Sequence, residues 1–167
     1  AKIELVVTQN IDGLHSLAGT SPEKLVELHG TDRQVECQSC HQRTAPEPHF
    51  EAFSRTRRCP RCAACGGLLK PATISFGQQL RQVDLQRAVA GAEAADLVIA
   101  LGSTLSVTPA ADIPLLAAAR GVPYVVINRG ATEHDGHPAV TLRLDGDVAQ
   151  IFAPAVAAAS GGTQHEG

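Results

Sequence analysis

Aromatic side chains are scarce in this 167-residue sequence: they make up 3% of it, and tryptophan is absent. A hydrophobic core must therefore consist of Ala, Val, Leu and Ile. The content of 44% hydrophobic and 19% charged residues is that of an ordinary globular protein. A chain of this length can form one sizeable core and a small insert, which excludes two full domains.

The sequence also lacks an excess of positive charge, because its formal net charge is -3. Without a basic field to gather phosphates, nucleic acid is not expected as a direct partner. The first residues, AKIELVVTQN, lack the regions of a signal peptide, and no apolar run approaches membrane length. We expect a soluble cytoplasmic protein that does not bind a membrane. Nothing in the sequence indicates an oligomeric state.

The five cysteines lie close together, and an odd number does not suit a disulfide framework. In a reducing compartment such cysteines are more often metal ligands. Cys37 and Cys40 form one CxxC pair. The second pair of a four-thiolate zinc site is either Cys59 with Cys62 or Cys62 with Cys65.

Glycines favour the later pair. A metal-binding CxxC turn needs a positive φ just after its second cysteine, and Gly66 follows Cys65 whereas Ala63 follows Cys62. His41 is a further possible zinc ligand, but it directly follows Cys40, which makes it difficult for both side chains to bind the same ion. A closed four-thiolate site has no open position for a substrate, so a structural role is favoured over redox or catalytic work. The predicted ligands of one structural zinc ion are Cys37, Cys40, Cys62 and Cys65.

Apolar runs rich in β-branched residues alternate with Ala-rich helical stretches, which predicts an α/β fold with a parallel sheet. Ligands of such sheets bind at the carboxyl ends of strands, where TQNID, GSTLS and IN occur here. A short helix is expected to begin near Asp12. The predicted strands are 3–7, 96–101, 122–128 and 140–145. The predicted longer helices are 83–95, 109–120 and 147–159.

The ordered motifs TQNIDGLH, ELHG, two CxxC pairs, GGLLKPATISFGQ, LGSTLSV and VVIN closely resemble those of the sirtuins, NAD-dependent protein-lysine deacylases. The resemblance runs from about residue 3 to residue 148. It implies NAD as cofactor, an acylated-lysine protein or peptide as partner, and transfer of the acyl group to ADP-ribose with release of nicotinamide. It also supports Cys62 with Cys65, since the second pair in that family directly precedes the segment matching GGLLKP. The alternatives are a non-catalytic zinc-containing module that binds NAD or ADP-ribose, and a protein ADP-ribosyltransferase.

The resemblance also implies roles for single residues. His29 matches the general base that acts on the cofactor ribose, and Asn10 and Asp12 complete the catalytic group. His15, in the same motif, is interpreted as structural. The implied cofactor-binding residues are Gln9, Asn10, Ile11, Asp12, Gly102, Ser103, Thr104, Asn128 and Val148. The implied substrate-binding residues are Ile74, Phe76 and Gly77, for which core packing of Ile74 and Phe76 is the competing interpretation.

The sequence departs from the family pattern at Gln78, where a glutamate is usual, and it contains neither the glycine-rich phosphate loop nor any GxG. The expected fold is therefore a Rossmann-like parallel sheet with helices on both faces, incomplete because its first strand is missing, plus a small zinc-ribbon insert. We expect residues 1–30 and 71–158 to form the partial NAD-binding domain, 31–70 the zinc module, and 159–167 a disordered tail. The 167 residues alone are expected to bind NAD weakly and to deacylate little.

Overall fold

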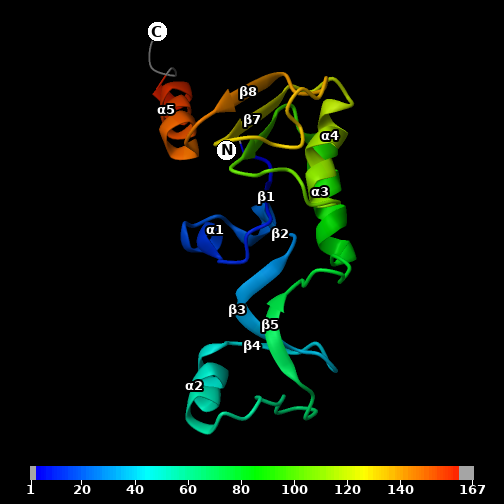
Figure 1. The fold of residues 1–167 in the computed structure, drawn as a ribbon, viewed down its shortest axis with the longest axis vertical. Coiled ribbons are helices and arrows are strands. Elements are labelled where there is room, and N and C mark those ends of the chain that lie inside the picture. Colours follow the sequence, from blue (N-terminus) through cyan, green and yellow to red (C-terminus); the bar gives the residue numbers. More distant parts are fainter. Residues whose placement is uncertain (1–2, 162–167) are drawn as a thin grey trace. The chain divides into compact units, whose positions relative to one another are not determined.

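The computed structural model describes residues 3–161 (Figure 1). The chain forms two compact units that divide between Ala88 and Val89, within helix α3 (Gln82–Ala94). We call them unit 1 and unit 2. Among residues 3–161, no helix has both the length and the apolar character needed to cross a membrane.

Unit 1 begins with a parallel pair of short strands, β1 (Val6–Thr8) and β2 (Leu25–Glu27). The pairing runs from Val6 opposite Leu25 to Thr8 opposite Glu27, so both strands end at the same edge. The connection carries α1 (Leu14–Leu17) and a single 3-10 turn, η1 (Pro22–Lys24). The first predicted strand is therefore present but begins later, and β2 was not predicted, because three residues are too few to show a hydrophobic period.

The rest of unit 1 is an antiparallel sheet in the order β4-β3-β5. Its strands are β3 (Gly30–Cys37), β4 (Arg43–Thr44) and β5 (Leu69–Thr73). Helix α2 (Glu47–Thr56) lies in the segment that the sequence marked only as a cysteine-rich insert. Its apolar residues Phe50 and Phe53 are three apart, as on one face of a helix, and both remain exposed.

Unit 2 holds a three-stranded parallel sheet in the order β6-β7-β8. The strands β6 (Val98–Leu101), β7 (Tyr124–Asn128) and β8 (Leu142–Asp145) lie within the three predicted stretches. Together with β1 and the helices they give the mixed α/β fold with parallel strands that the sequence predicts.

The helices of unit 2 differ from the prediction in two places. The expected helix 109–120 is a 3-10 turn, η2 (Ala110–Asp112), followed by α4 (Ile113–Ala118), whose first turn contains a proline. Helix α5 (Val148–Gly161) is longer than expected. Residues 159–161 are helical although we expected a disordered tail from 159, which fits the strong helix propensity of the preceding alanines. The expected tail residues 162–167 lie outside the described part of the chain.

A buried Tyr–His pair stabilises unit 2. Tyr124, the only tyrosine of the sequence, is fully buried beside Leu105 and Val126, and its hydroxyl is hydrogen-bonded to Nδ1 of His134 at 2.9 Å. Burial raises the pKa of Tyr124 to about 12 and, with a contribution from His137, lowers the pKa of His134. His134 is 6% exposed, so the folded protein favours its neutral imidazole.

This pair predicts a pH-dependent stability of unit 2. The folded state holds His134 neutral to a lower pH than the unfolded chain does, so proton uptake below about pH 6.5 favours unfolding and the free energy of unfolding decreases there. Urea titrations followed by Tyr124 fluorescence at pH 7.5 and pH 5.5 would measure this decrease in the free energy of unfolding. The two pH values lie on either side of about 6.5, the ordinary pKa of histidine. His134→Gln should reduce the difference between the two pH values, and His49→Gln in unit 1 should not. An unchanged difference in the His134 variant would contradict the assignment.

Candidate active site and metal centre

The polar residues that follow β1 lie at the shared carboxyl edge of β1 and β2. Leu28, which follows β2, donates its backbone N–H to the carbonyl of Thr8 at 3.0 Å. The next residue along each strand therefore comes close to the other strand, and His29 Nδ1 lies 3.0 Å from the carbonyl oxygen of Gln9. The structure thus brings together His29 and Gln9, which are 20 residues apart in sequence.

This contact determines the tautomer of His29. A carbonyl oxygen only accepts hydrogen bonds, so Nδ1 of His29 carries the hydrogen and donates it to Gln9. In a neutral imidazole the other nitrogen, Nε2, then holds the lone pair. His29 is half-buried, and the arrangement leaves Nε2 as the nitrogen that can accept a proton.

The turn from Gln9 to Asp12 is held by its backbone. The Thr8 hydroxyl accepts a hydrogen bond from the backbone N–H of Asn10 at 3.1 Å, and the carbonyl of Ile11 accepts one from Asp32 at 2.9 Å. Asp12 accepts one from the N–H of Leu14 at 3.0 Å, which supports the start of α1. Asn10 and Ile11 are exposed and Asp12 is half-buried, so these side chains are accessible at the sheet edge.

Gly30 joins this edge to the antiparallel sheet. Its φ is 76°, and a Cβ at this position would lie 2.1 Å from the carbonyl oxygen of Ala72. Only glycine allows this approach. The neighbouring carbonyl of His29 accepts a hydrogen bond from the N–H of Ile74 at 2.8 Å, so the segment after β5 lies directly beside the histidine.

The predicted substrate strip follows Ile74. Ile74 is half-buried, Phe76 is 99% exposed, and Gly77 has a φ of 84°. Core packing therefore does not explain Phe76. Gln78, where the family usually has glutamate, accepts a hydrogen bond from the N–H of Ser75 through Oε1 at 2.8 Å, so the amide oxygen closes this turn.

Unit 2 contains a separate open pocket of about 480 Å³ at the carboxyl ends of its strands. It brings together three of the predicted cofactor residues, Gly102, Asn128 and Val148. Gly102 has a φ of 60°, and a Cβ there would lie 3.6 Å from the Val148 side chain. The buried Asn128 donates its side-chain N–H groups to the carbonyls of Arg129 and Gly130, at 3.2 and 3.1 Å.

The two hydroxyl residues after Gly102 are not among the residues lining this pocket. Ser103 accepts a hydrogen bond from the N–H of Leu105 at 3.1 Å, and the Thr104 hydroxyl lies 2.9 Å from that of Ser106. Both side chains thus take part in the local turn.

Four pocket-lining residues were not predicted from the sequence, namely Arg129, Gly146, Asp147 and Ala149, and two of them are charged. Arg129 follows β7 and Asp147 precedes α5, and the two form an ion pair at 2.6 Å. Asp147 stands at a helix start, where a carboxylate normally indicates only a cap. Its position two residues after the end of the predicted strand 140–145 was the available signal, because strand ends bind ligands in such sheets.

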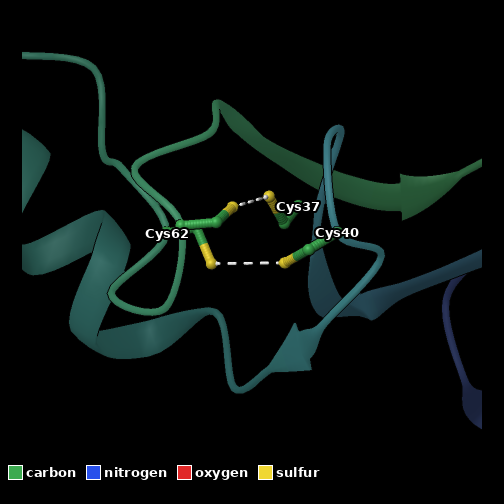
Figure 2. A group of neighbouring side chains, drawn as sticks. Cys37, Cys40 and Cys62 are labelled. Carbon is green, nitrogen blue, oxygen red and sulfur yellow. Dashed lines mark hydrogen bonds between the residues drawn. The ribbon is translucent and has the colours of Figure 1, made fainter.

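Four cysteine sulfurs in unit 1 form a compact group, in which Cys37 and Cys40 face Cys62 (Figure 2). The Sγ atoms of Cys37 and Cys65 are 3.5 Å apart, and those of Cys40 and Cys62 are 3.7 Å apart. All four lie within 4.8 Å of one another. Sulfurs about 2.3 Å from a tetrahedral zinc ion are about 3.8 Å apart, so the group fits zinc.

The two CxxC turns have the same backbone geometry. His41 and Gly66, each directly after the second cysteine of its turn, have φ values of 60° and 74°. Each donates its N–H to the carbonyl of the first cysteine, Cys37 or Cys62, at 3.0 and 2.8 Å. This equivalence is the reason why Cys62 pairs with Cys65, as the glycine argument predicts, and Cys59 is not one of the four.

The environment of Cys37 favours a thiolate. The backbone N–H groups of Cys40 and Ser39 point at its sulfur and lower the pKa of Cys37 to about 6. Gly67 is required beside it, because a Cβ there would lie 2.7 Å from the Cys37 sulfur. The imidazole of His41 turns to Glu36, with Nδ1 at 3.3 Å from Oε1, so it is not part of the sulfur group.

Residues 1–109 match the Sir2 family. An NAD-dependent protein deacetylase of Rhodopseudomonas palustris is 41% identical over 144 residues, which are 86% of this chain and 57% of that protein. One from Haloarcula marismortui is 40% identical over 154 residues, 92% of this chain and 57% of that protein. The chain thus spans little more than half the length of these relatives.

Solved Sir2 structures have the same fold. A complex with a p53 peptide and NAD+ has a TM-score of 0.84 and 36% identity, and covers 96% of this chain and 64% of that one. A Sir2 protein bound to a propionylated peptide gives a TM-score of 0.84 with 36% identity, covering 95% of this chain and 64% of the other.

The sulfur geometry predicts which cysteines zinc needs. Cys65→Ser should lower zinc affinity by more than about tenfold, since it removes a thiolate of the tetrahedral set. Cys59→Ser is the matched control and should keep one zinc per chain. Metal content and competition with a chromophoric chelator would measure both. Zinc lost from the Cys59 variant and kept by the Cys65 variant would favour the other pairing.

Proposed function

We propose, on the premise that this chain belongs to the Sir2 family, that it is the catalytic part of an NAD-dependent protein-lysine deacylase. The observation that carries the proposal is the position of His29. Its Nδ1 donates a hydrogen bond to the Gln9 carbonyl, so its Nε2 can accept a proton. The histidine lies at a strand edge that also carries Asn10 and Asp12.

We assign the candidate NAD-binding residues within each unit by itself. We propose that Gln9, Asn10, Ile11 and Asp12 hold the nicotinamide and its ribose. The adenosine end is assigned to the pocket of unit 2, with Gly102, Asn128 and Val148, and Ser103 and Thr104 shaping the loop above β6. NAD supplies the leaving group, nicotinamide, and the ADP-ribose that takes the acyl group. Relatives named as NAD-dependent deacetylases support this assignment.

His29 is proposed as the general base for a ribose hydroxyl. An imidazole can accept a proton in one step and return it in another near neutral pH. The Gln9 carbonyl orients the ring and stabilises the hydrogen on Nδ1, so the proton would be exchanged at Nε2. Asn10 and Asp12, on the turn fixed by Thr8 and α1, would position the reacting ribose and the carboxamide.

The acylated lysine would lie along the strip of Ile74, Phe76 and Gly77. This strip starts at the hydrogen bond between Ile74 and His29, so a peptide that pairs with it would bring its side chain to the histidine. Phe76 is almost fully exposed and can cover the acyl-lysine stem. Acylated peptides bound to related Sir2 proteins support this type of substrate.

We propose that zinc is a structural ion that holds the module of residues 31–70 together. Residues 1–30 and 71–158 are proposed as the NAD-binding part. We also propose a cytoplasmic location, because closely spaced cysteines that bind a metal are typical of a reducing compartment.

The test is a deacetylation assay with NAD and an acetyl-lysine peptide, following nicotinamide and O-acetyl-ADP-ribose. We expect slow product formation by the purified chain, and His29→Ala should lower the rate by more than about 100-fold because the general base is lost. His15→Ala is the matched control and should keep the rate, since His15 lies on α1 and not at the strand edge.

Three results would contradict the proposal. Product formation that is unaffected in the His29 variant would place the base elsewhere. Release of nicotinamide together with transfer of ADP-ribose to a protein would indicate an ADP-ribosyltransferase. A folded, zinc-loaded chain that binds ADP-ribose without turnover would indicate a non-catalytic module.

A further inference from the structure

Helix α2 of unit 1 has an exposed aromatic face. Within the described residues 3–161, this helix buries none of its side chains. Phe50 and Phe53 lie three positions apart, so they share one face of the helix, and they are 53% and 40% exposed. The whole sequence contains only four phenylalanines and one tyrosine. Two of these five aromatic residues thus lie on one short helix that contributes nothing to the core.

Arginines follow the aromatic face directly. Arg55 is in the last turn of α2, and Arg57, Arg58 and Arg61 lie between this helix and the second CxxC turn. Arg61 donates Nη1 to the carbonyl of Gly66 at 3.2 Å and so belongs to that turn. The other three are exposed, and they form no ion pair with any residue in the described range 3–161. Three guanidinium groups are therefore available to a partner.

The positive charge of this region is not balanced along the chain. Residues 52–83 contain five arginines, one lysine and no aspartate or glutamate, although the whole chain has a formal net charge of -3. A run of arginines by itself is commonly only a solvated surface. This run adjoins exposed aromatic side chains, and aromatic residues and arginine are the types enriched at protein–protein interfaces.

The backbone of this surface is fixed at both ends. At the start of α2, Nε2 of His49 lies 2.8 Å from the hydroxyl of Thr44, which ties the helix to β4. At its end, the Thr56 hydroxyl donates to the carbonyl of Ala52 at 2.8 Å and accepts a hydrogen bond from the N–H of Arg58 at 3.3 Å. A partner would therefore bind a surface whose backbone is already ordered, which lowers the entropic cost of association.

We propose that α2 and the arginines after it form a docking surface for an acidic segment of a partner protein that also carries apolar side chains. Phe50 and Phe53 would contact the apolar side chains, and Arg55, Arg57 and Arg58 would pair with the carboxylates. Charge complementarity selects this occupant, because a basic segment is repelled and an uncharged one leaves the guanidinium groups unpaired. The inference goes beyond the proposed function, since none of these residues belongs to the candidate active site.

The test is the fluorescence anisotropy of labelled peptides mixed with the zinc-loaded chain. The probe peptide consists of three Asp-Phe-Asp-Leu repeats. One comparison peptide has Ser in place of Phe and Leu, and the other has Lys in place of Asp. At low salt the probe should bind at least about fivefold more tightly than either comparison peptide. Absence of probe binding, or equal binding of a comparison peptide, would overturn the proposal.

Two double variants locate the binding. Phe50→Ser with Phe53→Ser should weaken probe binding at least about fivefold, because the aromatic contacts are lost. Arg55→Gln with Arg58→Gln should weaken it at least about threefold at low salt, and this effect should disappear at high salt. All four side chains are exposed, so both variants should fold and keep one zinc per chain.

Matched controls make the same changes elsewhere. Phe76→Ser removes another exposed phenylalanine, and Arg81→Gln with Arg120→Gln removes the same charge from two other exposed arginines. Each control should change probe binding by less than about twofold. Weakening in the controls that equals the weakening in the α2 variants would overturn the location of the surface.

Other occupants give different results. A single-stranded oligothymidylate that binds more tightly than the acidic probe, and that depends on Arg55 and Arg58, would identify nucleic acid as the occupant. Self-association of the chain that is lost in the variant of Phe50 and Phe53, measured by sedimentation, would identify a second copy. Either result would overturn the assignment of an acidic partner segment.

Discussion

The backbone crossing at His29 and Gly30 is the constraint on which unit 1 depends. Gly30 must approach the Ala72 carbonyl more closely than any side chain would allow. This approach starts the β3–β5 ladder that leads to the zinc cysteines, and it places the His29 carbonyl against the N–H of Ile74. The same two residues therefore connect the candidate base, the substrate strip and the metal module.

In unit 2 the corresponding constraint is the hydrogen bonding around the connection from β7 to β8. Tyr124 and His134 hold one part of this connection in the core, and Arg143 ties the backbone at Asn128 to Asp135. Because these contacts are formed inside the unit, the pocket rim is fixed before any ligand binds. Asp147 and Arg129 of this rim are already paired with each other.

The sequence predicted the elements with enough apolar residues to show a pattern, such as β6, β7 and α3. It missed β2, because three residues show no period, and it gave no separate elements for β3, β4, α2 and β5, because they lie in and beside the segment that was interpreted only as a cysteine-rich insert. It also predicted one helix where Pro114 in the first turn of α4 separates it from the 3-10 turn before it. Short or weakly buried elements are stabilised by partners distant in sequence, which local patterns do not contain.

The sequence by itself determined the mixed α/β class, and it favoured Cys65 over Cys59 as the fourth zinc ligand through Gly66, while the structure decided between the two pairings by bringing Cys37, Cys40, Cys62 and Cys65 together. Its motif also predicted His29 as the candidate base. Only the tertiary structure decided which nitrogen of His29 is available, that Phe76 is exposed, and that Asp147 holds Arg129. The physical reason is that the first and third depend on contacts between residues far apart in sequence, which form only on folding. The exposure of Phe76 likewise depends on which other segments fold against it.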